Sequence, residues 1–138
     1  MPRYFAARGL EYDPSTTVVI DARMLDQIAE HQGVSWRGGD ILLLRTAWAG
    51  QYLAKTPEQR SATPWRQSPG LAQREETLRW LWDNEIALVA ADNLAVEADP
   101  VIDSDFRTPG ETPPAKGVDH SGMLHRPLIA LLGMALGE

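Results

Sequence analysis

The pattern of hydrophobic and polar positions alternates between helical and strand-like spacing, which predicts a domain of mixed α/β class. The clearest example is the segment 71–97, LAQREETLRWLWDNEIALVAADNLAVE. Glu75 and Arg79 have the i,i+4 spacing of an ion pair on the polar side of a helix. The apolar side of that helix is formed by Leu71, Leu78, Leu81 and Trp82. The uncharged run 86–91 then predicts a short strand that is covered on both faces.

The same alternation occurs earlier in the chain. Residues 16–20 are rich in β-branched side chains and predict a strand. Asp21 is suited to cap a helix over 22–32, and Gly33 is suited to end it. Residues 40–46, DILLLRT, contain four consecutive apolar positions, which indicates a central rather than an edge strand. The chain of 138 residues is therefore expected to form a single α/β domain with helices beside a sheet.

Two long segments lack a periodic pattern. Residues 47–70 contain three prolines together with Trp48, Tyr52 and Trp65. A loop of this length in a compact domain is usually a functional lid or disordered, and the aromatic side chains favour a lid. Trp48 is therefore a candidate for the wall of a substrate pocket, although Trp48 and Trp65 could equally fill the core beside the strand. Residues 98–122 predict a second loop, on the surface.

Two carboxylates follow the predicted strand 86–91. Asp92 comes directly after it and Glu97 five residues later. Open sheets of this kind usually bind ligands beyond the carboxyl ends of their strands, so both side chains are candidates for a substrate pocket. The alternative is that Asp92 belongs only to a turn and that Glu97 is only solvated.

Histidines are concentrated near the end of the chain. A short helix is predicted over 123–132, in which His125, Ile129 and Leu132 lie on one side. This pattern alone favours a core histidine with one hydrogen-bonded nitrogen. His120 and His125 are five positions apart, which on a helix separates them by roughly 140° and makes them a poor chelating pair.

Composition and charge exclude several classes of function. The net charge of -6 argues against nucleic acid or an anionic membrane surface as the main partner. The absence of cysteine excludes a thiol nucleophile, thiolate metal ligands and a disulfide scaffold. No phosphate-binding glycine motif is present, and no apolar run is long enough to span a bilayer. A cytoplasmic protein without a membrane or nucleic-acid partner is expected.

Five segments, in this order, carry a resemblance to a known family: RYFAARGLEYDP, GDILLLRTAW, PGL, ETLRWLWDNEIALVAADNLAVE and LHRPLIALLGMALGE. In order and spacing the chain resembles the cyclase family of metal-dependent hydrolases. The best known members of this family are bacterial kynurenine formamidases of tryptophan catabolism. The likeness extends in particular to the longer fungal-type and actinobacterial cyclases, and it covers nearly the whole chain.

This resemblance implies a swivelling β/β/α fold and a homo-oligomer acting on a small-molecule substrate. It also implies a divalent metal, zinc or manganese, that polarises an amide, formamide or lactone carbonyl and activates a water. Two of the family's metal ligands correspond to His125, in LHRPL, and to Glu138, in GMALGE. His125 thereby becomes a candidate metal ligand as well as a candidate core residue.

The main metal-binding motif of the family, HxGTHxD, does not occur in this sequence, whose only histidines are His31, His120 and His125. Two ligands do not complete a catalytic zinc site, which usually has three protein ligands and a water. We therefore expect the C-terminal part of a longer enzyme, incomplete at its N-terminus and inactive alone. The alternative is a non-catalytic remnant that assembles with itself or with a homologous subunit.

Overall fold

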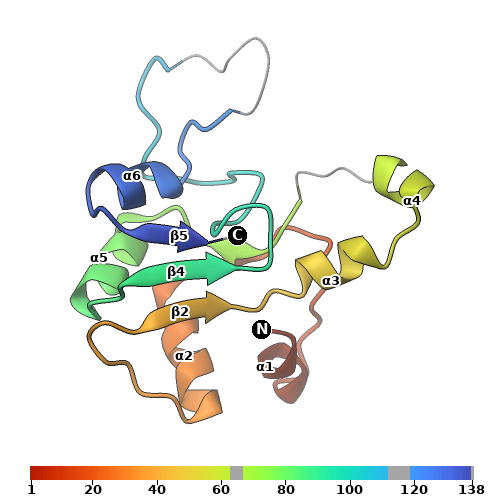
Figure 1. The fold of residues 1–138 in the computed structure, drawn as a ribbon, viewed down its shortest axis with the longest axis horizontal. Coiled ribbons are helices and arrows are strands. Elements are labelled where there is room, and N and C mark those ends of the chain that lie inside the picture. The colour runs from red at the N-terminus through yellow and green to blue at the C-terminus, as the bar shows by residue number, and fades with distance from the viewer. Residues whose placement is uncertain (63–66, 112–118, 138) are drawn as a thin grey trace.

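The computed structural model describes residues 1–62, 67–111 and 119–137, and these form two parallel sheets with flanking helices (Figure 1). The larger sheet has the strand order β2-β4-β5, and both strand pairs are parallel. Its strands are β2 (Ile41–Leu44), β4 (Leu88–Ala91) and β5 (Ala135–Gly137). The smaller sheet pairs β1 (Val19–Ile20) with β3 (Gly70–Leu71), also in parallel. The predicted mixed α/β class is confirmed.

Six helices occur in the described ranges: α1 (Pro2–Ala7), α2 (Ala22–Gln32), α3 (Trp48–Leu53), α4 (Pro57–Ala62), α5 (Glu75–Asp83) and α6 (His125–Ala130). The predicted limits of α2 are confirmed. The Asp21 carboxylate accepts a hydrogen bond from the Met24 N–H at 2.7 Å, and Gly33 ends the helix at a φ of +66°. None of the helices in the described ranges is long and apolar enough to cross a membrane.

One face of the larger sheet packs against the helices and forms the hydrophobic core. Leu42 and Leu44 of β2 and Val89 of β4 are buried on this face. They belong to one cluster with Leu25 of α2, Leu81 of α5, and Leu124 and Leu128 at the start of α6. These contacts hold the sheet and three helices in one unit.

The opposite face of the larger sheet is exposed and apolar. Ile41 and Leu43 project from it with exposed fractions of 59% and 72%. The strand register places further apolar residues on this open sheet face, which we define as Ile41, Leu43, Leu88, Ala90 and Ala135. The prediction that 40–46 is a central strand is wrong within the described residues, because β2 lies at one end of the order β2-β4-β5. The prediction that 86–91 is covered on both faces is also wrong there, because Leu88 and Ala90 of β4 lie on the open sheet face. An unbroken apolar run shows only that both faces of a strand are apolar, and does not show whether another segment covers each face.

The segment around α5 differs from its prediction at two positions. Leu71 belongs to β3 and not to the helix, because its N–H donates to the Val96 carbonyl at 3.0 Å and fixes an extended backbone. Trp82, predicted on the apolar side, has an exposed fraction of 62%. The ion pair between Glu75 and Arg79 is confirmed, with its N and O atoms 2.5 Å apart.

Other segments also depart from the predicted pattern. The segment 47–70 was expected to be irregular, but it contains α3 and α4, which extend from the carboxyl end of β2 away from the sheet (Figure 1). Helix α6 starts only at His125, and Ile129, predicted to be buried beside that histidine, has an exposed fraction of 56%. Helix α6 instead buries Pro127 and Leu128, so the buried side of the helix is shifted by one residue from the predicted position of Ile129.

Candidate functional site

The carboxylate of Glu97 is fully buried, with an exposed fraction of 0%. The backbone around it forms a parallel bridge to Leu71, since the Ala98 N–H donates to the Leu71 carbonyl at 3.0 Å. Gly70 permits this close approach: a Cβ atom there would clash with the backbone carbonyl of Glu97. The alternative that Glu97 is merely solvated is therefore wrong.

Glu97 is held against His125, the first residue of α6. The Nδ1 atom of His125 lies 2.5 Å from Oε1 of Glu97, and the histidine side chain keeps an exposed fraction of 21%. An ionised carboxylate only accepts hydrogen bonds, so Nδ1 is the donor and carries a proton. The neutral ring then presents an unprotonated Nε2 on the side away from Glu97.

The second oxygen of this carboxylate is unusual. Oε2 of Glu97 is buried and has no hydrogen-bond partner in the described part of the chain. Buried polar atoms in native proteins are nearly always satisfied, so this exception makes the pair formed by Glu97 and His125 a candidate for a functional site. The two oxygens of Glu97 thus have different surroundings, and only one of them fixes the imidazole.

His120 completes a row of three side chains. Its Nδ1 lies 3.1 Å from Nε2 of His125, and the two rings are 5.1 Å apart at an interplanar angle of 80°. The prediction that these histidines diverge around one helix is wrong, because residues 119–124 form a turn that precedes α6. The Met123 N–H donates to the His120 carbonyl at 3.2 Å, and Gly122 adopts a φ of +76°.

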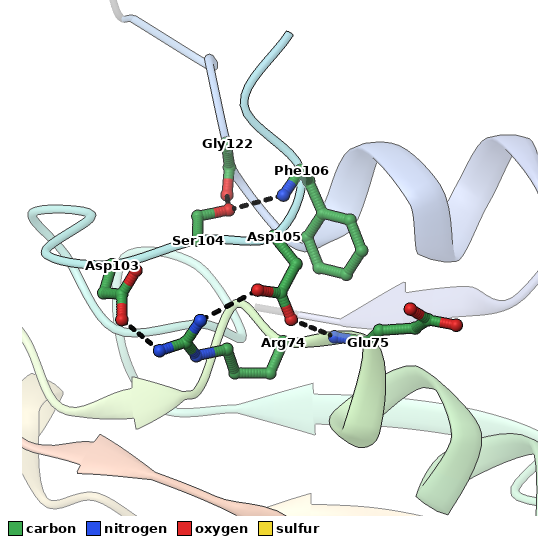
Figure 2. Close-up of polar contacts among 7 residues, drawn as sticks. All are labelled: Arg74, Glu75, Asp103, Ser104, Asp105, Phe106 and Gly122. Carbon is green, nitrogen blue, oxygen red and sulfur yellow. Dashed lines mark hydrogen bonds and ion pairs between the residues drawn. The ribbon is translucent and has the colours of Figure 1, made fainter.

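The turn that carries His120 is anchored to the loop that precedes it in the chain (Figure 2). The Ser104 hydroxyl donates to the Gly122 carbonyl at 2.6 Å and accepts from the Phe106 N–H at 3.0 Å. A Cβ atom on Gly122 would lie 2.8 Å from Cγ of Arg107, so a larger residue would push the turn away. The position of His120 therefore depends on contacts with residues 104–107.

The same loop is fastened to the start of α5. Figure 2 shows the Arg74 guanidinium between the carboxylates of Asp103 and Asp105, with 2.8 Å between Arg74 Nη1 and Asp105 Oδ1. The second oxygen of Asp105 accepts from the Glu75 N–H at 2.9 Å, so it satisfies one of the unpaired donors at the start of α5. The backbone N–H of Glu75 and, next, the Arg74 side chain hold the pKa of Asp105 below its ordinary value.

Asp92 and Trp48 are engaged elsewhere. Asp92 accepts three hydrogen bonds at the carboxyl end of β2, from the Thr46 N–H at 2.5 Å, the Thr46 hydroxyl at 2.8 Å and the Ala47 N–H at 3.0 Å. The Trp48 ring stacks on Tyr52 at 4.9 Å, and its Nε1–H donates to the Gln67 carbonyl at 2.8 Å. Asp92 thus joins the ends of two strands, and the pocket role of both residues stays a prediction.

Two of the residues predicted from the sequence are not among those that the structure describes. Glu138 and Trp65 are outside the described residues. The last described strand, β5, ends at Gly137 beside Ala90 of β4. The role of Glu138 as a metal ligand is therefore still a prediction.

The pair of histidines has the donor set that a transition metal uses. Two nitrogens bound to one zinc at about 2.0–2.1 Å lie roughly 3.3 Å apart in tetrahedral geometry, close to the 3.1 Å between His120 and His125. Metal-binding histidines usually donate their other N–H to a carboxylate, as His125 does to Glu97. Across residues 1–62, 67–111 and 119–137, however, no three His, Asp or Glu side chains are grouped to hold a metal. The described part brings two imidazole nitrogens together and supports one of the two rings with a buried carboxylate.

Comparison with known proteins identifies the family of the chain. The sequence profile of the family described as "Putative cyclase" matches residues 5–98, so the chain belongs to this cyclase family. A crystal structure described as a novel cyclase is 26% identical, with a TM-score of 0.58, over 70% of this chain and 31% of that one. The chain thus spans about a third of the length of that cyclase. No curated protein matches it. The matched residues include Asp92 and Glu97 and end before His120.

The Asp105 contacts predict how stability depends on pH. Because the pKa of Asp105 is lowered in the folded state, its contribution is present above the unfolded value of 3.8 and is lost as the pH falls below it. We expect Asp105→Asn to lower the urea midpoint at pH 7, with a difference from wild type that shrinks in acid. The control is Asp83→Asn, at the other end of α5, which should leave the midpoint unchanged at both pH values. A difference that persists undiminished in acid would contradict the assignment.

Proposed function

We propose that this chain is part of a metal-dependent hydrolase of the cyclase family that acts on an amide, formamide or lactone carbonyl. The observation that carries the proposal is the 2.5 Å contact between the buried Glu97 carboxylate and Nδ1 of His125. This carboxylate–histidine pair is the usual support of a metal ligand. The swivelling β/β/α arrangement of the family is consistent with the parallel sheets and is part of the same proposal.

In this proposal His125 holds the metal through Nε2, together with Glu138 and with ligands outside the described residues. Glu97 fixes the tautomer and the orientation of the His125 ring, and it does so from a position that water does not reach. When bound, a divalent ion supplies Lewis acidity toward a carbonyl oxygen and lowers the pKa of water to about 7. Zinc and manganese are the two candidates.

The protein's own contribution is orientation. Rotation of the His125 ring would leave the Glu97 carboxylate buried without the hydrogen bond from Nδ1, which costs several kcal/mol for a charged group. The ring is therefore held in one orientation before any ligand arrives, with 21% of its side chain exposed. A preorganised ligand of this kind favours metal binding because little conformational freedom is lost.

The first test is whether zinc stabilises the full chain through His125. We expect Zn²⁺ to raise the Tm of wild type, since a ligand at 100 times its Kd stabilises a fold by about 2.7 kcal/mol. His125→Ala should abolish this rise, and the matched control His31→Ala, an exposed histidine at the end of α2, should retain it. Calorimetry with and without a chelator measures the shift. An equal rise in wild type and His125→Ala would reject the proposed site.

A second candidate function is supported by the open sheet face. Parallel sheets are almost always covered on both sides, yet Ile41 and Leu43 are exposed here. A second copy of the chain presents the same uncharged surface, so two copies can cover each other by two-fold symmetry. On this hypothesis the chain is a self-associating, non-catalytic member of the fold.

Sedimentation velocity distinguishes this second candidate. We expect wild type to sediment as a dimer and Leu43→Asp as a folded monomer, because a charge in the centre of the interface is not compensated. Ile102→Asp replaces an equally exposed apolar residue outside the sheet and should leave the dimer intact. A wild-type chain that is a well-folded monomer over a wide concentration range would contradict self-association.

A further inference from the structure

We infer that His120 is a second imidazole ligand of the same metal, so that the turn 119–125 of this chain supplies a pair of nitrogens. This inference rests on the proposed function and extends it, because neither the resemblance nor the matched residues 5–98 assign a role to His120. The sequence did not favour His120 as a ligand, because two histidines five positions apart on one helix are a poor chelating pair. In the structure His120 lies on the turn that precedes α6, so helical spacing does not separate it from His125.

The geometry of the two rings supports a shared ligand. Nε2 of His125 points away from Glu97 and meets Nδ1 of His120 at 3.1 Å. Both atoms carry an in-plane lone pair when unprotonated. In the metal-free chain one shared proton joins the two nitrogens, and a cation that binds both takes the place of that proton.

The turn keeps His120 in this position through contacts that do not involve either ring. The Ser121 N–H donates to Asp119 at 2.8 Å, and the Ser121 hydroxyl donates to Glu111 at 3.1 Å. Glu111 also pairs with Arg126 of α6 at 2.7 Å, so the turn and the helix share one anchor. His120 itself is exposed, which leaves the metal position open to solvent.

The ligand type narrows the choice of metal. Imidazole nitrogens suit zinc, cobalt, nickel and copper, whereas manganese and magnesium favour carboxylate, carbonyl and water oxygens. A pair formed by His120 and His125 therefore favours zinc over manganese in this chain. Cobalt is a useful probe, because it accepts the same ligands and its visible absorption reports their geometry.

The experiment measures metal binding by the full chain in four forms: wild type, His120→Gln, His125→Ala and His31→Ala. Gln at position 120 can still donate a hydrogen bond to Nε2 of His125 but offers no imidazole nitrogen. Zn²⁺ affinity is measured by competition with a chromophoric chelator, and Co²⁺ coordination by visible absorption. Circular dichroism confirms that each variant is folded. A second variant, His120→Ala, serves if the Gln form does not fold.

We expect His120→Gln and His125→Ala each to lower Zn²⁺ affinity at least about tenfold and to change the Co²⁺ spectrum, with His31→Ala unchanged. If His125→Ala loses affinity while His120→Gln matches wild type, the role of His120 is rejected and the proposed function stands. If neither variant differs from wild type, both the inference and the proposed metal site are rejected.

Discussion

The hydrogen bond between the buried Glu97 carboxylate and the His125 imidazole is the constraint on which the rest of the site depends. A carboxylate with an exposed fraction of 0% is tolerated only with a compensating donor, and Nδ1 of His125 at 2.5 Å provides it. The bond joins the segment that follows β4 to the first residue of α6. It therefore links the part of the chain that matches the cyclase family with a helix beyond the matched residues.

The surrounding fold serves to place these two residues. Gly70 lets β3 approach the backbone of Glu97, and Leu71 bonds on both sides of it. The loop 103–107 is fastened to α5 through Arg74 and holds the turn at Gly122 that leads into α6. The two ends of the site are thus fixed by separate sets of contacts. The open sheet face lies outside these contacts, since none of them involves Leu43.

Much of the fold is predictable where the signal is local. The limits of α2 follow from Asp21 and Gly33, which act on adjacent backbone groups. The position of 40–46 at the edge of the described sheet could not be predicted, because it depends on which distant strands pair beside it. Leu71 fits a helical stripe in sequence, but its hydrogen bonds to Val96 and Ala98 override that periodicity.

The site itself was only partly predictable. Asp92 and Glu97 both follow the same strand, yet Asp92 accepts hydrogen bonds from Thr46 and Ala47 whereas Glu97 turns into the core. The partner that decides this for Glu97 is 28 residues away. His120 was missed because a turn at Gly122 replaces the expected helix. Gly122, two residues after His120, was the only signal in the sequence, and its contact with Ser104 is not visible there.

The most direct test of this account is the protonation of the His125 ring, measured by two-dimensional NMR of the ¹⁵N-labelled chain in mildly alkaline, metal-free buffer. We expect a neutral ring with its proton on Nδ1, hydrogen-bonded to Glu97, and an unprotonated Nε2. A ring that carries its proton on Nε2, or that alternates freely between both tautomers, would show that Glu97 does not orient it and would contradict the central claim.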